Sequence, residues 1–365
     1  MKAVLVIPTL DAGGAERAMT ELAGFLAERG DDIVLATFEA TGTQDFYAPH
    51  PAVRRVRLGN PQPAGSIAGK LAANWQRVQS LRRLLSAEKP AVLLGFMETA
   101  NVLCLLAAAW LKLPVVVAER TDPAMHTAVP AAWRHGRRLL YRRATAIVAQ
   151  TDAAASWLRE HCGAAVHIIP NALRPLPPAG AARELLLLSV GRLEPVKGFD
   201  VLLRAFALVH SDFPAWQLAI VGEGAEGERL RALASALGLD QRVAWHGRTR
   251  EIECWYARAA IVVQASRFEG FPNVVLEAMG MGAAVISTDC RSGPRELISS
   301  GNNGWLVPVD DEMALAGALR TLMADAGLRQ RLGDAAMSVL QRFSTEHVLG
   351  QWRQLLAGAA RRQIT

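Results

Sequence analysis

The first half of the chain alternates short apolar runs with longer segments in which apolar residues recur every three or four positions. Short runs of this kind are typical of buried strands, and the longer period is typical of amphipathic helices. The predicted strands cover 4–7, 33–37, 91–95, 115–118, 146–149 and 166–169. The predicted helices lie near 15–29, 66–87, 98–111, 132–143 and 152–162. This alternation predicts a parallel sheet covered by helices on both faces.

After a proline-rich connector at 170–178 the alternation starts again. The predicted strands are 185–190, 217–221, 260–263 and 284–287, and the predicted helices lie near 198–210, 224–237, 271–281 and 312–326. We therefore expect an α/β protein of two doubly wound, Rossmann-like domains that face a cleft, since ligands of such sheets bind off the carboxyl ends of the strands.

The domain bounds follow from this pattern. We expect an N-terminal domain over 1–172, a Pro-rich hinge over 173–183 and a C-terminal domain over 184–344. The last segment, 345–365, carries Val348, Trp352, Leu355 and Leu356 at helical spacing. Such a stripe needs an apolar partner, so we expect this helix to cross back and pack on the hinge and the first domain.

Composition adds limits to this picture. A chain of 365 residues is long enough for two cores. Its four cysteines show no metal-ligand spacing and indicate reduced thiols. The apolar stretch 102–118 is divided by Lys112 and Pro114, so it predicts a buried helix and strand rather than a membrane span. The run 3–10 is too short for a signal peptide, and we expect a cytoplasmic protein.

The net charge is +6, and the densest basic stretch is 133–143. At helical spacing it places Arg137, Arg138, Arg142 and Arg143 beside apolar side chains that include Tyr141. This arrangement predicts an interfacial helix on an anionic membrane surface. A plain solvated helix face is the alternative, and nucleic-acid binding is the weakest of the three interpretations.

The stretch 266–279 carries the most specific candidate chemistry. Two carboxylates, Glu269 and Glu277, bracket a turn in which Gly270 permits unusual backbone angles and Pro272 suits the first helical position. The amides near Phe271, Asn273 and Val274 then point out of the helix N-terminus, which attracts anions. Acceptor carboxylates beside donor amides suit a ligand with both hydroxyls and phosphate. The alternative is an ordinary helix with acidic residues near its start.

Three other loops follow predicted strands. Gly13 and Gly14 begin the first helix, although a tight turn without a ligand is an alternative there. Gly191 opens a loop in which Arg192 and Lys197 are placed to approach one diphosphate, and Gly222 lies in a further glycine turn. The first loop lacks the G-x-G-x-x-G spacing, which argues against NAD.

Together these motifs resemble the GT-B glycosyltransferases of family 4 over essentially the whole chain. The resemblance rests on the Gly-Gly loop at 13–14, G-R-L-x-x-x-K-G at 191–198, V-G-x-G at 221–224 and E-x7-E at 269–277. The stretches 119–123 and 289–296 resemble the branch of the family that builds bacterial lipid-linked oligosaccharides and polysaccharides. Enzymes of this branch often use N-acetylhexosamine donors, and the resemblance is to its N-acetylgalactosaminyltransferases. Thr121 departs from the asparagine that is usual in that branch.

The resemblance implies a role for each matched residue. Arg192 and Lys197 would neutralise the diphosphate, and Glu269 would hold hydroxyls of the donor sugar. Glu277 would accept from the ribose, and Gly14 would let the first helix approach the donor phosphate or the acceptor. It also implies a metal-independent hexosyltransferase that retains anomeric configuration and uses a nucleotide sugar, UDP-linked by preference, as substrate without a cofactor. No D-x-D motif, as in metal-dependent GT-A enzymes, occurs in the sequence.

Acceptor binding is expected in the first domain. Gly13, Glu119, Arg120, Asp122 and His126 follow strand ends there, and Arg120 is a candidate for an acceptor phosphate. His126 is a candidate for proton transfer, although a histidine in a loop is often only exposed. In the other domain, His246 is a candidate beside the nucleobase.

We therefore expect a retaining transferase at the inner face of the cytoplasmic membrane, acting on a glycolipid or a polyprenyl-diphosphate-linked saccharide. A soluble acceptor and a sugar-nucleotide-binding protein without turnover are the alternatives, and no nucleic-acid partner is expected. Direct front-face transfer and double displacement both remain open.

Overall fold

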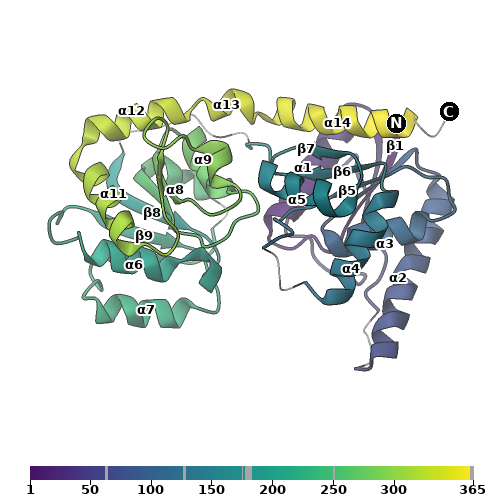
Figure 1. Ribbon diagram of the computed structural model, residues 1–365, viewed down its shortest axis with the longest axis horizontal. Helices are drawn as coiled ribbons and strands as arrows, with labels where there is room; N and C mark the ends of the chain where they lie inside the picture. The colour runs from purple at the N-terminus through teal and green to yellow at the C-terminus, as the bar shows by residue number, and fades with distance from the viewer. Residues whose placement is uncertain (62–64, 126–128, 175, 177–182, 250, 362–365) are drawn as a thin grey trace. The chain divides into compact units, whose positions relative to one another are not determined.

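The computed structural model describes residues 1–61, 65–125, 129–174, 176, 183–249 and 251–361. These residues form two compact units, one made of 1–172 with 346–365 and the other of 173–345. Most of the expected hinge, 173–183, lies outside the described residues. Figure 1 shows both units and labels many of their helices and strands.

The N-terminal unit is built on a parallel sheet in the order β3-β2-β1-β4-β5-β6-β7. Its strands are β1 (Lys2–Ile7), β2 (Asp32–Thr37), β3 (Arg54–Arg57), β4 (Val92–Phe96), β5 (Val115–Ala118), β6 (Ala146–Ala149) and β7 (Val166–Ile168). Its helices are α1 (Gly14–Glu28), α2 (Ile67–Glu88), α3 (Glu98–Ala108), α4 (Ala131–Leu140), the 3-10 turn η1 (Tyr141–Arg143), α5 (Asp152–Cys162) and α14 (Thr345–Arg361). Ser66 and Thr151 cap α2 and α5 by accepting from backbone amides.

Alternate residues of each central strand are buried on opposite faces of this sheet. In β1, Leu5 and Ile7 pack in the cluster that includes helix α1, whereas Val4 and Val6 pack in the cluster that includes helices α2 and α3. A strand that is buried on both faces has a continuous run of apolar residues in its sequence. This confirms the expected three-layer arrangement.

Helix α14 completes the N-terminal core, as the apolar stripe near the C-terminus predicted. Val348, Trp352 and Leu356 are buried in the same cluster as Leu5. The Trp352 ring lies 5.4 Å from the ring of Phe96, between centroids. Full burial of each such side chain stabilises the fold by about 1.5–3 kcal/mol, so the last helix is an integral part of this unit.

The C-terminal unit has a parallel sheet in the order β10-β9-β8-β11-β12-β13. Its strands are β8 (Glu184–Val190), β9 (Gln217–Val221), β10 (Val243–His246), β11 (Ala259–Gln264), β12 (Ala284–Thr288) and β13 (Trp305–Val307). Its helices are η2 (Pro195–Lys197), α6 (Phe199–Ala207), α7 (Gly227–Ala236), α8 (Ile252–Arg258), α9 (Asn273–Gly280), α10 (Pro294–Leu297), α11 (Glu312–Ala324), α12 (Ala326–Ala336) and α13 (Val339–Arg342).

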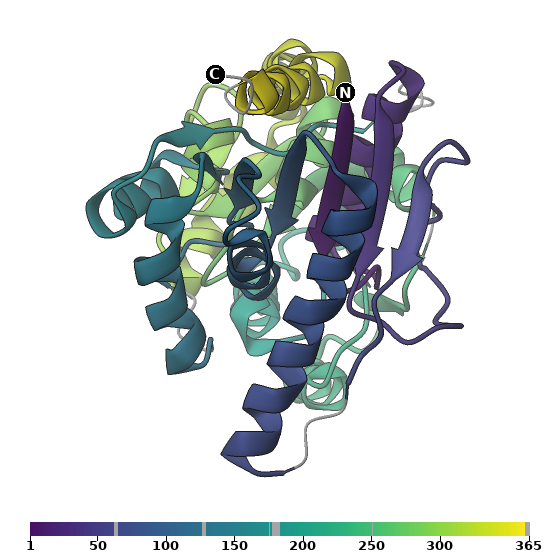
Figure 2. The same cartoon turned by 90° about the vertical axis from the view of Figure 1, so that its right-hand side faces the viewer.

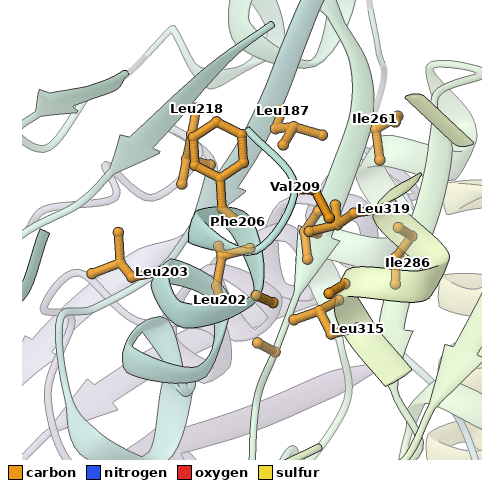
Figure 3. Close-up of a cluster of buried hydrophobic side chains, with 14 of the residues drawn as sticks. Leu187, Leu202, Leu203, Phe206, Val209, Leu218, Ile261, Ile286, Leu315 and Leu319 are labelled. Carbon is orange, nitrogen blue, oxygen red and sulfur yellow. The ribbon is translucent and has the colours of Figure 1, made fainter. Parts of the chain in front are cut away.

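Figure 3 shows the core on one face of this sheet. Leu202 and Phe206 of α6 and Leu315 and Leu319 of α11 meet strand residues such as Leu187. A second buried cluster, which includes Val275 of α9, covers the other face. The C-terminal unit is therefore also a three-layer α/β fold.

The strand order places a topological switch point in each unit. In the N-terminal sheet β1 lies between β2 and β4, and in the C-terminal sheet β8 lies between β9 and β11. Successive connections leave such a strand pair in opposite directions, which opens a crevice at the carboxyl ends of the strands. The loops after β1 and β4, and those after β8 and β11, are therefore the natural places for ligands.

The basic stretch 133–143 does not lie as expected. Arg137 is 1% exposed and Tyr141 is fully buried, whereas Arg138, Arg142 and Arg143 are exposed. The Arg137 guanidinium lies over the Trp157 ring, 4.9 Å from its centroid, and 3.6 Å from Glu119. Arg137 therefore does not belong to an exposed basic face, because a buried carboxylate is its partner, and membrane contact through the other arginines stays a prediction.

Candidate active site

The switch point of the C-terminal unit brings together two loops that are far apart in the sequence. Lys197 ends η2 in the loop that follows β8, and Glu269 lies in the loop that follows β11. Lys197 Nζ donates a hydrogen bond to Glu269 Oε1 at 2.7 Å. Two residues that the motifs singled out separately therefore form one ion pair.

The Glu269 carboxylate is 7% exposed and has further donors. Ser266 Oγ donates to Oε1 at 2.6 Å, and Gln264 Nε2 donates to the same oxygen at 2.5 Å. Buried carboxylates are stable only when they are paired and hydrogen-bonded. Neither Gln264 nor Ser266 was predicted, because a polar residue at the end of an apolar strand does not reveal its partner.

Arg192 is placed differently. It pairs with Glu194 in its own loop at 2.8 Å, and 65% of its side chain is exposed. In the described part of the chain, Lys197 is therefore the predicted cation that contacts Glu269. Gly191 and Gly198 bound this loop, and Gly198 takes φ 63°, where a Cβ would lie 2.0 Å from the carbonyl oxygen of Ala265. This close approach holds the two loops against each other.

Helix α9 begins at Asn273, two residues after the start of the predicted helix near 271–281. Pro272 is the N-cap rather than the first helical residue, and Asn273 donates its amide to the Phe271 carbonyl at 3.0 Å. The first hydrogen bond of the helix runs from the Leu276 amide to the Pro272 carbonyl. The amides of Val274 and Val275 come before it and have no hydrogen bond within the described residues. These two amides, at the positive end of the helix, are the free donors.

Phe271 is 6% exposed and its ring packs near Phe343 in the core, so only its backbone is left as a candidate for ligand binding. One other expectation for this element was wrong. Gly270 is not among the glycines with positive φ in the described chain. The residue with the unusual angles is Gly293, at φ 101°, where a Cβ would lie 2.7 Å from Pro272 Cδ.

Glu277, one turn into α9, is 4% exposed. Arg174, which no sequence motif singles out, lies with Nε 3.5 Å from Glu277 Oε1 and pairs with Glu253 at 2.6 Å. The second acidic residue of the E-x7-E motif therefore has a guanidinium beside it. In the same unit His246 ends β10, exposed, with its ring 4.3 Å from that of Trp255.

In the N-terminal unit, Gly13 is the N-cap of α1 and Gly14 its first residue. A Cβ on Gly13 would lie 2.1 Å from Oε2 of Glu16, so the Glu16 side chain folds back over this turn. The carboxylate lies at the positive end of the helix, where negative charge is favoured. The loop thus carries an acidic group that the glycine motif alone did not indicate.

The expected acceptor residues after β5 are largely buried. Glu119 is 1% exposed, and Tyr141 donates a hydrogen bond to its Oε1 at 2.6 Å. Burial raises the pKa of Glu119 to about 7, against the opposing effect of nearby Arg137. Asp122 is fully buried and accepts from the Ala124 amide at 2.9 Å. Glu119 and Asp122 are therefore buried within this loop, and a role for them in acceptor binding stays a prediction.

Arg120 is buried as well, with 8% of its surface exposed. It donates a hydrogen bond to Asn171, and its guanidinium lies 4.6 Å from the Phe96 ring centroid. Burial lowers its pKa to about 9, and the carboxylates of Glu16 and Glu21 oppose that change. Arg120 is thus held near the acidic side of α1. His126 lies outside the described residues.

A nearby feature was not predicted. Met97, which follows β4 at the switch point of this unit, takes φ 74°. Positive φ is rare for a side chain of this size and is often found at functional sites. Sequence alone offers no signal for it, since glycine is the residue that such angles normally indicate.

Two doubly wound α/β units, each with a topological switch point, have the architecture of the GT-B class of glycosyltransferase. Sequence models of two families match nearly all of the chain, "Glycosyltransferase Family 4" over 12–175 and "Glycosyl transferases group 1" over 179–339. The chain belongs to the glycosyltransferases, and its two halves match these two family models.

One relative is a Campylobacter jejuni protein named GalNAc-alpha-(1->4)-GalNAc-alpha-(1->3)-diNAcBac-PP-undecaprenol alpha-1,4-N-acetyl-D-galactosaminyltransferase. It is 27% identical over 98% of each chain. Among solved structures, sucrose-phosphate synthase from Thermosynechococcus elongatus superposes with a TM-score of 0.85 at 21% identity, over 98% of this chain and 99% of that one. Anabaena HepE in complex with UDP-glucose gives 0.81 at 21% identity, over 98% and 100%. These likenesses confirm the predicted fold class.

Proposed function

We propose that this chain is a retaining, metal-independent glycosyltransferase that moves a sugar from a nucleotide diphosphate sugar to a lipid-linked saccharide at the inner face of the cytoplasmic membrane. The observation that carries the proposal is the Lys197–Glu269 pair, 2.7 Å apart at the switch point of the C-terminal unit. The lysine supplies a cation for the diphosphate, and the glutamate supplies a carboxylate for the sugar hydroxyls. The reaction breaks the bond between that sugar and that diphosphate.

The chemistry follows from charge. As the bond between the sugar carbon and the diphosphate breaks, positive charge develops on the sugar and negative charge on the departing diphosphate. Lys197, with the free amides of Val274 and Val275, would stabilise the diphosphate, as fixed donors do in other transition states. Glu269 would hold the sugar hydroxyls, and Glu277 the ribose. The acceptor oxygen forms the new bond, and its proton leaves with the phosphate in a front-face transfer.

The proposed substrates rest on the relatives. The Campylobacter jejuni relative is named for transfer of N-acetylgalactosamine to an undecaprenol-linked saccharide, and HepE was solved with UDP-glucose. We therefore propose a UDP-sugar as donor, with N-acetylhexosamine among the candidate sugars, and a polyprenyl-diphosphate saccharide as acceptor. A soluble acceptor remains the second candidate.

A donor screen tests this proposal. The purified chain is incubated with UDP-, GDP- and ADP-sugars, first alone to measure slow hydrolysis and then with a polyprenyl-diphosphate saccharide, with and without EDTA. We expect UDP-sugar consumption, an α-linked product by NMR and no loss of rate with EDTA. A chain that binds and turns over none of these sugars would refute the proposal, and a preference for lipid-free saccharides would favour the soluble acceptor.

The membrane part of the proposal rests on α2 instead of the basic helix. Ile67, Leu71 and Trp75 are 79%, 66% and 60% exposed and lie four residues apart, on one face of the helix. They belong to its first turns, which extend beyond the ends of the strands in Figure 2. Because α2 follows β3 of a parallel sheet, these turns lie at the carboxyl edge, where ligands bind.

An exposed apolar stripe with cations is suited to the surface of an anionic membrane. Lys70 is exposed beside Leu71, and Arg138, Arg142 and Arg143 are exposed on the same unit. Among the helices of the described residues, none is both long and apolar enough to span a bilayer. Contact with the membrane would therefore be peripheral.

Flotation with vesicles tests the stripe. We expect the triple variant Ile67→Ser, Leu71→Ser, Trp75→Ser to lose about tenfold or more of its binding to anionic vesicles, because each apolar side chain removed from lipid weakens binding. Met313→Ser, which removes a side chain 67% exposed on α11, is the matched control. Equal flotation of the triple variant and wild type would exclude α2 as the contact.

A further inference from the structure

The Glu269 carboxylate is bound asymmetrically. Lys197, Ser266 and Gln264 all donate to Oε1, at 2.7, 2.6 and 2.5 Å. Within the described residues, no donor contacts Oε2. Three donors on one oxygen fix the plane and direction of the carboxylate, and the other oxygen keeps its capacity to accept hydrogen bonds.

Gln264 is the least expected of these donors. It is the last residue of β11, whose other residues, 259–263, are all alanine, isoleucine or valine. It is 5% exposed, and its own Oε1 has no hydrogen-bond partner. Burial of an unpartnered amide oxygen costs folding free energy. An apolar side chain would avoid that cost, so the amide contributes something other than stability.

Its neighbours show what is held in place. Ser266, two residues later, donates to the same carboxylate oxygen, and the Thr288 hydroxyl at the end of β12 donates to the Ser266 carbonyl at 2.5 Å. Gln264 and Ser266 thus approach Glu269 from the end of a central strand. Groups fixed by rigid elements in this way are the ones that hold a reactive side chain to within fractions of an ångström.

We propose that Gln264 is a positioning residue for the transferred sugar: its amide N–H holds Glu269 Oε1 so that Glu269 Oε2 accepts from the sugar hydroxyls. This inference rests on the proposed function and concerns the sugar half of the donor. The diphosphate and the nucleoside are bound by other groups, so loss of Gln264 leaves them in place. The residue separates sugar recognition from nucleotide recognition.

Calorimetry with two ligands tests this separation. The donor is the nucleotide sugar that wild type binds best, and the second ligand is the nucleoside diphosphate of the same base. Gln264→Met keeps the length and apolar volume of the side chain but removes the donor. We expect about a tenfold loss of affinity for the nucleotide sugar, the usual size for a hydrogen bond to a charged group, and less than about a twofold loss for the nucleoside diphosphate.

Further variants distinguish positioning from packing. Gln217→Met is the matched control, because Gln217 is the exposed first residue of β9 and lies at the amino-terminal ends of the strands, away from Glu269. It should change neither affinity. Gln264→Glu places an acceptor against Glu269 and should weaken sugar binding more than Gln264→Met does. Ser266→Ala removes a second donor from the same oxygen, so it should also act selectively, and it replaces Gln264→Met if that variant does not fold.

The outcomes separate the two hypotheses. Selective loss of the nucleotide sugar supports the positioning role. Unchanged affinity for both ligands, or an equal loss for both, overturns it, because an equal loss means that the side chain only supports the fold. If wild type itself binds no nucleotide sugar, the proposed function fails instead.

Discussion

Replacement of Lys197 by alanine should reduce kcat about 100-fold, the usual cost of removing one group that stabilises transition-state charge. The Lys197 ammonium lies at the switch point of the C-terminal unit and contacts the carboxylate that we assign to the donor sugar, so it is placed where the diphosphate would leave. Affinity for the donor should fall less than kcat, because the charge on the leaving group is largest in the transition state.

The fold should tolerate this change. The Lys197 side chain is 21% exposed, and Ser266 and Gln264 continue to donate to Glu269 in its absence. Thermal unfolding and steady-state rates with the donor identified in the screen check both points. Arg204→Ala, which removes a half-exposed cation from α6, is the control and should leave kcat unchanged. A Lys197→Ala enzyme with the wild-type rate would remove Lys197 from the active site.

Arg192 offers an internal comparison. Its side chain is 65% exposed and paired with Glu194, so removal should cost less than removal of Lys197. The motif treats the two cations alike, since both lie in one loop after a buried strand. Their different burial comes from the short 3-10 turn 195–197, which directs Lys197 toward the loop after β11. Loop motifs indicate the chemistry of a site but leave the position of each side chain undefined.

The sequence predicted the main strands and long helices well because burial on two faces leaves a continuous apolar run. The bounds of β5 and β6 agree with the prediction. β3, with the sequence Arg-Arg-Val-Arg, was missed because an edge strand carries charged residues that a central strand cannot. β13, three residues long, was missed because so short a run has no period.

The buried network around Glu119 shows the limit of periodicity. Arg137 and Tyr141 have the spacing of an exposed basic helix, yet Tyr141 donates to Glu119 and Arg137 lies 3.6 Å from it. These residues meet only after α4 and η1 have packed against α3, so no local pattern reports the contact. The same reason explains α2, where the helix was predicted but the exposure of Trp75 was not, because exposure depends on which neighbours are absent.

Gly222→Ala should be strongly destabilising, with a loss of about 3 kcal/mol of unfolding free energy. Gly222 follows β9 with φ 144°, a conformation open mainly to glycine, and a Cβ there would lie 1.9 Å from the carbonyl oxygen of Gly191. The clash is with backbone, so no side-chain rotation relieves it. The loop after β8 must move, and with it the turn that carries Lys197.

Because of that movement, the variant should lose activity as well as stability. Denaturant unfolding and kcat/KM at a temperature where the variant remains folded separate the two effects, and we expect kcat/KM to fall about tenfold or more, since a small displacement of a charged group weakens its transition-state contact. Gly317→Ala is the matched control, since Gly317 is an exposed helical residue of α11 with nothing within 4 Å of a new Cβ. It should be neutral or stabilising by up to about 1 kcal/mol. A stable Gly222→Ala enzyme with full activity would mean that the β8 loop can shift without displacing Lys197, and the coupling between the glycine turn and the ion pair would have to be abandoned.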